Sequence, residues 1–188
     1  MPGYLAASAV VLLLALVLAR LLLLKRMGIR AMHFGNLDKT DFLIPPVALF
    51  YFYTIFASAF GWPRVGGQRF FHSEALAWVG VGLCTGGLVI LLLSLVSFGS
   101  SFRVGIDVDA SDKLVTTGMF AVSRNPIYVG FALVLIGQFL VLPNWVPLAY
   151  WVGGFWLFHR QVLREEKFLR EHYGDEYAEY CRRVRRYV

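Results

Sequence analysis

The sequence predicts an all-α fold, a multi-pass transmembrane bundle of about five spanning helices followed by a cytoplasmic C-terminal amphipathic helix. Of the 188 residues, 58% are hydrophobic and only 16% are charged, whereas soluble domains usually carry about 25% charged residues. The mean hydropathy is +0.62. Apolar runs of roughly 20 residues, the length that spans a bilayer, recur along the chain. We therefore expect residues 1–188 to form one membrane-embedded domain.

The apolar runs are about 4–24, 42–62, 74–98, 127–142 and 145–162. The first lacks the basic leader and the small-residue cleavage site of a signal peptide, so we expect it to remain as an anchor. The second opens at Asp41, a predicted helix cap, with Pro45 and Pro46 in its first turn. A turn at Pro143 and Asn144 joins the last two runs into a helical hairpin. Residues 1–98 thus contain three spans, and residues 99–188 contain a polar loop, the hairpin and the C-terminal helices.

The basic residues predict the orientation. Of the 18 lysines and arginines, 15 fall in segments that share one side of a five-span bundle. Arg64 and Arg69 fall on the other side, and Arg20 lies near the end of the first run. Because cytoplasmic segments are rich in basic residues, the N-terminus is predicted outside and the C-terminus in the cytoplasm. The membrane would be the inner membrane of a bacterium or the endoplasmic reticulum of a eukaryote. This topology accounts for the net charge of +6, so no nucleic-acid partner is expected.

Several other kinds of site are not expected. Cys84 lies in an apolar run and Cys181 in the tail, which excludes a disulfide framework, and the four histidines lack metal-ligand spacing. The glycine-rich run 79–87 has no preceding strand, so it does not match a dinucleotide-binding loop. Its Gly82 and Gly86 form a G-x-x-x-G pair, which is expected to let another helix approach closely.

The first polar segment with candidate chemistry is LVTTGMFAVSRNPIYVG, residues 114–130. Arg124, Asn125 and Tyr128 place hydrogen-bonding groups at the membrane surface just before the fourth run. The alternative is an interfacial loop in which Arg124 and Tyr128 anchor the chain to lipid headgroups.

The second segment is REEKFLREHYGDEYAEYCRRVRR, residues 164–186. Glu165 and Glu166 follow the fifth run as adjacent acids among many bases. Gly174 can end one helix and Asp175 can cap the next. An amphipathic stripe at helical spacing contains Leu169, Tyr173, Tyr177, Tyr180 and Val184. A charged face bound to anionic lipid is the alternative, and it explains the bases better than the glutamates.

Together the two segments resemble the isoprenylcysteine carboxyl methyltransferase family, part of a wider group that includes phospholipid N-methyltransferases. The resemblance covers roughly residues 95–186 and depends on the order and spacing of motifs that are individually weak. The residues that match are Leu114, Val115, Gly118, Phe120, Arg124, Asn125, Pro126, Tyr128, Gly130, Glu165, Glu166, Tyr173, Gly174, Glu176, Tyr177 and Tyr180.

The resemblance implies S-adenosylmethionine as the methyl donor, bound in a cytoplasm-facing pocket, and a lipophilic small-molecule or lipid acceptor that enters from the bilayer. It implies catalytic roles for Arg124, Glu165, Glu166 and Arg160, and His159 and Arg160 could hold an acceptor carboxylate or phosphate. The implied cofactor-binding residues are Leu114, Val115, Gly118, Phe120, Arg124, Asn125, Pro126, Tyr128, Gly130, Glu165, Glu166 and Tyr177. The favoured function is methyl transfer to an isoprenylcysteine-like carboxylate.

Three alternatives remain open at this point. Many carboxyl methyltransferases of this group have His where this chain has Asn125, and phospholipid N-methyltransferases can carry Asn there, so a phospholipid amine is an alternative acceptor. Tyr180 and Cys181 resemble the tail of NADPH-dependent sterol and lipid reductases of the membrane. The third alternative is a non-enzymatic protein that keeps the fold. The sequence leaves the oligomeric state open.

Overall fold

The computed structural model describes residues 1–26, 44–63, 65, 67–98 and 114–188. These residues contain helices and no strand. The elements are α1 (Pro2–Arg26), α2 (Ile44–Phe60), α3 (Glu74–Phe98), the 3₁₀ helix η3 (Gly118–Ala121), α4 (Pro126–Val141) and α5 (Trp145–Arg183). All five predicted apolar helices are present, and Pro45 and Pro46 lie in the first turn of α2 as expected. The predicted cap Asp41 lies outside the described residues, as do the basic residues of 27–43 and 99–113.

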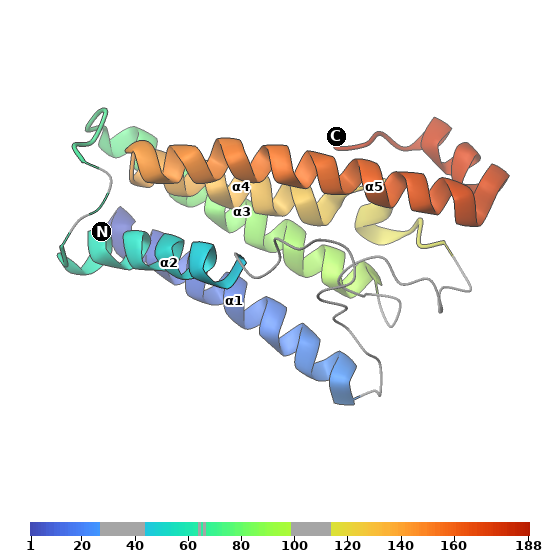
Figure 1. Cartoon of the computed structure of the whole chain (residues 1–188), viewed down its shortest axis with the longest axis horizontal. Helices are drawn as coiled ribbons and strands as arrows, with labels where there is room; N and C mark the ends of the chain where they lie inside the picture. Colours follow the sequence, from blue (N-terminus) through green and yellow to red (C-terminus); the bar gives the residue numbers. More distant parts are fainter. Residues whose placement is uncertain (27–43, 64, 66, 99–113) are drawn as a thin grey trace.

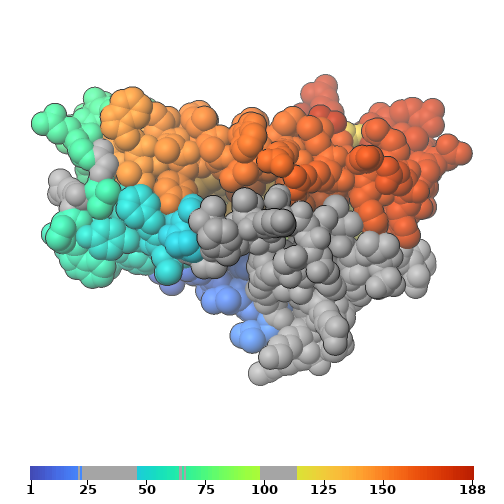
Figure 2. Space-filling model, in the orientation of Figure 1, coloured from blue at the N-terminus to red at the C-terminus, as the bar shows by residue number. Residues whose placement is uncertain are grey.

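The helices run along the long axis of the molecule in two groups, with α3, α4 and α5 on one side and α1 and α2 on the other (Figure 1). α5, orange to red, runs along the upper side of the molecule (Figure 2). Tyr150 of α5 joins the groups, since its ring lies 4.7 Å from that of Tyr51 and its hydroxyl donates to the Val47 carbonyl at 2.6 Å. The fully buried Gln138 donates to the carbonyl of Ala6 at 2.8 Å.

Glycines allow α3 and α4 to pack closely. A Cβ atom at Gly80 would lie 2.6 Å from the Gly137 carbonyl oxygen, and one at Gly87 would lie 2.7 Å from that of Gly130. The expectation for Gly82 and Gly86 is wrong, because nothing lies within 4 Å of a Cβ at Gly82 or at Gly86. The closely packed glycines are seven residues apart on each helix, which returns them to the same face after two turns.

The apolar surface fits a bilayer better than water. Length and composition mark two of the described helical segments as able to cross a membrane, Pro2–Arg20 and Glu74–Ser97, while the apolar segments Pro46–Phe60 and Pro126–Val141 are shorter. Large apolar side chains such as Leu12, Val96 and Trp156 are exposed along the helices. Contiguous exposed apolar surface of this kind marks contact with a membrane or a partner.

The end of α5 brings the C-terminus back over the bundle. Gly174 has φ 51° and ψ −120°, which interrupts the helix and confirms the prediction that a helix ends there. Beyond this kink Tyr177 and Tyr180 are buried, and the Tyr180 hydroxyl donates to the Phe120 carbonyl of η3 at 2.6 Å. The tail after Arg183 then turns back toward α5 (Figure 1). This return places the tail beside both sequence segments singled out for chemistry.

Candidate functional site

A polar cluster forms where the loop before α4, the middle of α5 and the C-terminal tail meet. The backbone N–H of Arg124 donates to the carbonyl of Arg185 at 3.0 Å, and the Ser123 hydroxyl donates to the carbonyl of Arg186 at 3.3 Å. These bonds pin the loop to residues more than sixty positions later in the chain. Pro126, fully buried in the first turn of α4, starts the helix where the loop ends.

Glu166 is the centre of one half of the cluster. Its side chain is 5% exposed, and its two oxygens are held by guanidinium groups from different elements. Arg124 Nη2 lies 3.1 Å from Oε1, while Arg186 donates from Nη2 to Oε2 at 2.8 Å and from Nε to both oxygens at 3.1 Å. These hydrogen bonds raise the pKa of the Arg186 guanidinium. Two positive charges on one carboxylate leave this half with a surplus positive charge.

Asn125 links the loop to the same half. Its Nδ2 donates to the Arg186 carbonyl at 3.1 Å and to Glu166 Oε1 at 3.4 Å, and the residue is buried. An amide can make these bonds without exchanging a proton. The geometry therefore gives Asn125 a structural role in which neither a base nor an acid is needed.

Glu165 is the centre of the other half. Its Oε1 accepts from the Tyr128 hydroxyl at 2.6 Å and from Gln161 Nε2 at 3.0 Å. Burial raises the pKa of the Glu165 carboxyl, although both hydrogen bonds act to lower it. Among the described residues, the side chains that donate to Glu165 are neutral, whereas those that bind Glu166 are two charged arginines. The adjacent acids thus differ: Glu166 is buried and paired with two arginines, whereas Glu165 is half-buried and bonded to neutral groups.

Further contacts involve the tail and Tyr128, a hydrogen-bond partner of Glu165. The Tyr187 hydroxyl lies 2.7 Å from His159 Nδ1, so the tail also contacts α5 one to two turns before the glutamates. The ring of Tyr128 packs 5.8 Å from that of Phe158. The tail therefore contacts α5 at two places, through Arg186 at Glu166 and through Tyr187 at His159.

Not every residue predicted for the site lies in the cluster. Arg160 is exposed, and its guanidinium lies 5.6 Å from the centre of the Trp156 ring. Gly130 faces α3, where a Cβ would lie 2.7 Å from Leu91 Cγ. Leu114 and Val115 are half-buried residues of the chain leading to η3.

Three further predicted residues support the cluster from outside it. Gly118 has φ 62°, and a Cβ there would lie 2.8 Å from the Cβ of Ser97 at the end of α3. Phe120 is buried and accepts the bond from Tyr180. Tyr177 is fully buried beside Glu166 and Cys181, and burial raises the pKa of its hydroxyl. These residues hold η3 and the C-terminal helix against the loop.

Three members of the cluster are absent from the sequence-based set. Gln161 stands four residues before Glu165, so the spacing that aligns side chains on one helix face could have identified it. Arg186 and Tyr187 lie in a run of bases that any cytoplasmic tail could carry. Their contacts depend on the turn at Gly174 and on the tail's return, which no local pattern specifies.

Comparison with known proteins identifies the family. The family profile described as phospholipid methyltransferase matches residues 75–176, more than half of the 188-residue chain. The chain belongs to this family. The match includes Arg124, Asn125, Tyr128, Glu165 and Glu166, and it ends before the tail residues that complete the cluster.

Individual relatives carry a more specific name. A probable protein-S-isoprenylcysteine O-methyltransferase of Oryza sativa subsp. indica is 33% identical over 58% of this chain and 59% of its own length. Protein-S-isoprenylcysteine O-methyltransferase of Saccharomyces cerevisiae is 34% identical over 54% of this chain and 47% of its own length. The aligned region thus spans about half of each of these relatives.

A solved structure shares the fold. The eukaryotic intramembrane Ras methyltransferase, isoprenylcysteine carboxyl methyltransferase, superposes with a TM-score of 0.58, covering 80% of this chain and 55% of that one at 24% identity. The sequence resemblance to this group is therefore confirmed. With the apolar helices described above, the shared fold makes this chain an integral membrane protein.

Proposed function

We propose that this chain transfers a methyl group from S-adenosylmethionine to a lipophilic acceptor at the membrane surface, and that the acceptor is an isoprenylcysteine-like carboxylate. The observation that carries the proposal is the division of charge across the cluster. Glu165 offers a half-buried carboxyl bonded to neutral donors, and the Arg124–Glu166–Arg186 group has a surplus positive charge. The relatives named as O-methyltransferases support the reaction class.

The proposed donor carries charges of both signs, and the two halves of the cluster complement them. Its sulfonium and ammonium groups are cationic, which suits Glu165. Its carboxylate, or that of the acceptor, suits the arginine half, because charge-assisted bonds from guanidinium to carboxylate are among the stronger ones in proteins. When bound, the donor supplies an electrophilic methyl carbon. Tyr128 and Gln161 hold the Glu165 carboxyl in one orientation for that encounter.

The chemical step needs alignment more than proton transfer. A carboxylate oxygen of the acceptor attacks the methyl carbon, a new O–C bond forms, and the S–C electron pair leaves on sulfur. A carboxylic acid is already ionised near neutral pH, so no base is required. A step without a base is compatible with an amide at position 125, because Asn125 donates hydrogen bonds to the tail and to Glu166 and does not need to accept a proton. Holding two reactants in line can supply about 7–11 kcal/mol of the barrier reduction.

The proposed setting is a bundle of five spans with the N-terminus outside and the cluster at the cytoplasmic surface. From Trp145 to Glu165, α5 rises about 30 Å, which matches the thickness of the hydrocarbon core. The acceptor's apolar chain would stay in the bilayer while its carboxylate reaches the cluster. The segment after Gly174, with Tyr177 and Tyr180 turned inward, would lie along the cytoplasmic surface.

A phospholipid amine is the second candidate acceptor, favoured by the family's description and by Asn125. An amine must lose a proton before it attacks. Glu165, whose pKa is raised by burial and which is bonded only to neutral donors in the cluster, could take that proton.

Methyl transfer in nanodiscs distinguishes the two acceptors. The purified chain is incubated with radiolabelled S-adenosylmethionine and either a farnesylcysteine analogue or phosphatidylethanolamine. We expect base-labile label on the analogue, as a methyl ester requires. Base-stable label in the lipid headgroup would instead establish the amine reaction, and no label on either acceptor would refute both.

A further inference from the structure

Two adjoining pockets lie at the opposite end of the bundle from Glu165 and Glu166. Their volumes are about 440 Å³ and 410 Å³, and both are lined by Ser58, Arg69 and His72. Glu74, at the start of α3, lines the first pocket. Because the helices separate this end from the polar cluster by about 30 Å, the pockets have no part in the proposed methyl transfer.

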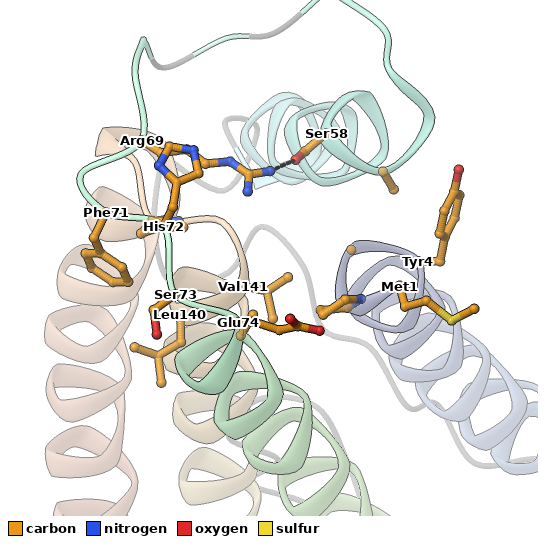
Figure 3. Close-up of a pocket in the computed structure, with 15 residues that line it drawn as sticks. Met1, Tyr4, Ser58, Arg69, Phe71, His72, Ser73, Glu74, Leu140 and Val141 are labelled. Carbon is orange, nitrogen blue, oxygen red and sulfur yellow. Dashed lines mark hydrogen bonds between the residues drawn. The ribbon is translucent and has the colours of Figure 1, made fainter.

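The loop that carries Arg69 and His72 is fixed by its two central aromatic residues. The Phe70 N–H donates to the Pro143 carbonyl at 2.7 Å, and the Phe70 ring packs edge-on against Trp145 at 4.9 Å. Phe71 packs against Phe139. With these two rings held by the α4–α5 hairpin, the flanking Arg69 and His72 lie together at the rim of the pocket (Figure 3).

The pocket has separate basic and acidic walls. Arg69 Nη2 reaches Ser58 Oγ at 3.4 Å, beside the imidazole of His72 (Figure 3). Glu74 lies apart from them, on the side nearer α1 (Figure 3). Most basic residues of this chain lie on the predicted cytoplasmic side, but Arg69 lies on the other. The positive-inside rule therefore does not explain its position. A guanidinium, an imidazole and a hydroxyl together suit the oxygens of a phosphate group.

The aromatic residues at this end of the bundle indicate where such a phosphate would come from. Tyr4 lines the first pocket, and Trp62, Phe70 and Trp145 are exposed at the same end of the bundle. Tyrosine and tryptophan gather at the headgroup level of a bilayer. We propose that this end of the bundle binds the phosphate of a membrane phospholipid through Arg69 and His72, and that Glu74 favours a headgroup that carries an amine.

Native mass spectrometry of the full chain in detergent tests this site without using enzymatic activity. The protein is titrated with phosphatidylethanolamine, with phosphatidylglycerol and with inorganic phosphate. We expect one tightly bound phospholipid, with phosphatidylethanolamine preferred. Arg69→Gln should weaken the binding of both lipids about tenfold, the effect of losing a hydrogen bond between charged groups. Glu74→Gln should remove the preference between the lipids.

The controls separate lipid binding from folding and from general charge. Arg182→Gln removes an exposed charge at the other end of the molecule and should leave lipid binding unchanged. His72→Gln gives a second test at the basic wall. Lipid affinities are compared only among variants whose melting temperature equals that of the wild type. Unchanged lipid affinity in folded Arg69→Gln and His72→Gln would overturn the site. Inorganic phosphate binding as tightly as lipid would overturn the lipid assignment, and an unaltered preference in Glu74→Gln would overturn the role of Glu74.

Discussion

Replacing each of the adjacent acids Glu165 and Glu166 by glutamine should change a different property: ligand affinity for Glu165 and thermal stability for Glu166. In Glu166→Gln the carboxylate that holds Arg124 and Arg186 is lost, and the Arg124 side chain, 11% exposed, is left as a buried charge. Removing one partner of a buried ion pair costs about 3–5 kcal/mol. Because Arg186 is 37% exposed and can recover water contacts, we expect about 3 kcal/mol.

That loss converts into a measurable change of melting temperature. For a chain of this size each kcal/mol corresponds to roughly 2–4 °C, so Glu166→Gln should melt about 6–12 °C lower. Glu165→Gln should not melt lower at neutral pH, since it replaces a carboxyl whose pKa burial raises. It should instead weaken the binding of S-adenosylhomocysteine about tenfold or more, through the loss of a partner for a cationic group.

Thermal unfolding in detergent and calorimetric binding are measured on both variants. Glu171→Gln is the matched control, because its pair with Lys167 is exposed and worth little. A melting temperature of Glu166→Gln equal to that of the wild type would refute the structural role of Glu166. A melting temperature of Glu165→Gln as low as that of Glu166→Gln would refute the distinction between the two acids.

Three further predictions follow from the geometry. Gly137→Ala should lower the melting temperature by about 5 °C through overpacking against Gly80, whereas Gly82→Ala, which faces open space, should not. Ligand affinity should fall on acidification as the raised Glu165 pKa is crossed. The wild type should lose stability relative to Glu165→Gln as pH rises through that pKa, and titrations upward from the usual carboxyl pKa would detect both effects. In a Cys181→Ser background, an impermeant thiol reagent should label Gln68→Cys from outside and Ala178→Cys from the cytoplasm; labelling from the same side would contradict the topology.

The sequence predicts the helices well because hydrophobic length and breakers are local properties. The boundaries near Pro45, Pro143 and Gly174 agree with α2, the hairpin turn and the break in α5. Which glycines face a neighbouring helix is a tertiary property. The choice of Gly82 and Gly86 followed a spacing rule, yet rotation of α3 turns Gly80 and Gly87 toward α4.

The candidate site was predictable in part for the same reason. The order of the motifs predicts Arg124, Asn125, Tyr128 and the two glutamates as site residues, and in the structure they lie in one cluster. The division of labour between Glu165 and Glu166 was not predictable. Adjacent residues on a helix point about 100° apart, so the folded positions of Arg124 and Arg186 decide which acid is neutralised.

The central claim, that the cluster around Glu165 binds the methyl donor, is tested most directly by calorimetry on purified protein with S-adenosylhomocysteine and with NADPH. The account predicts one site for S-adenosylhomocysteine, weakened about tenfold or more in Glu165→Gln and unchanged in Glu171→Gln, with no binding of NADPH. Binding of NADPH instead would indicate a reductase, and binding of neither would indicate a non-enzymatic protein; each result would contradict the proposed function.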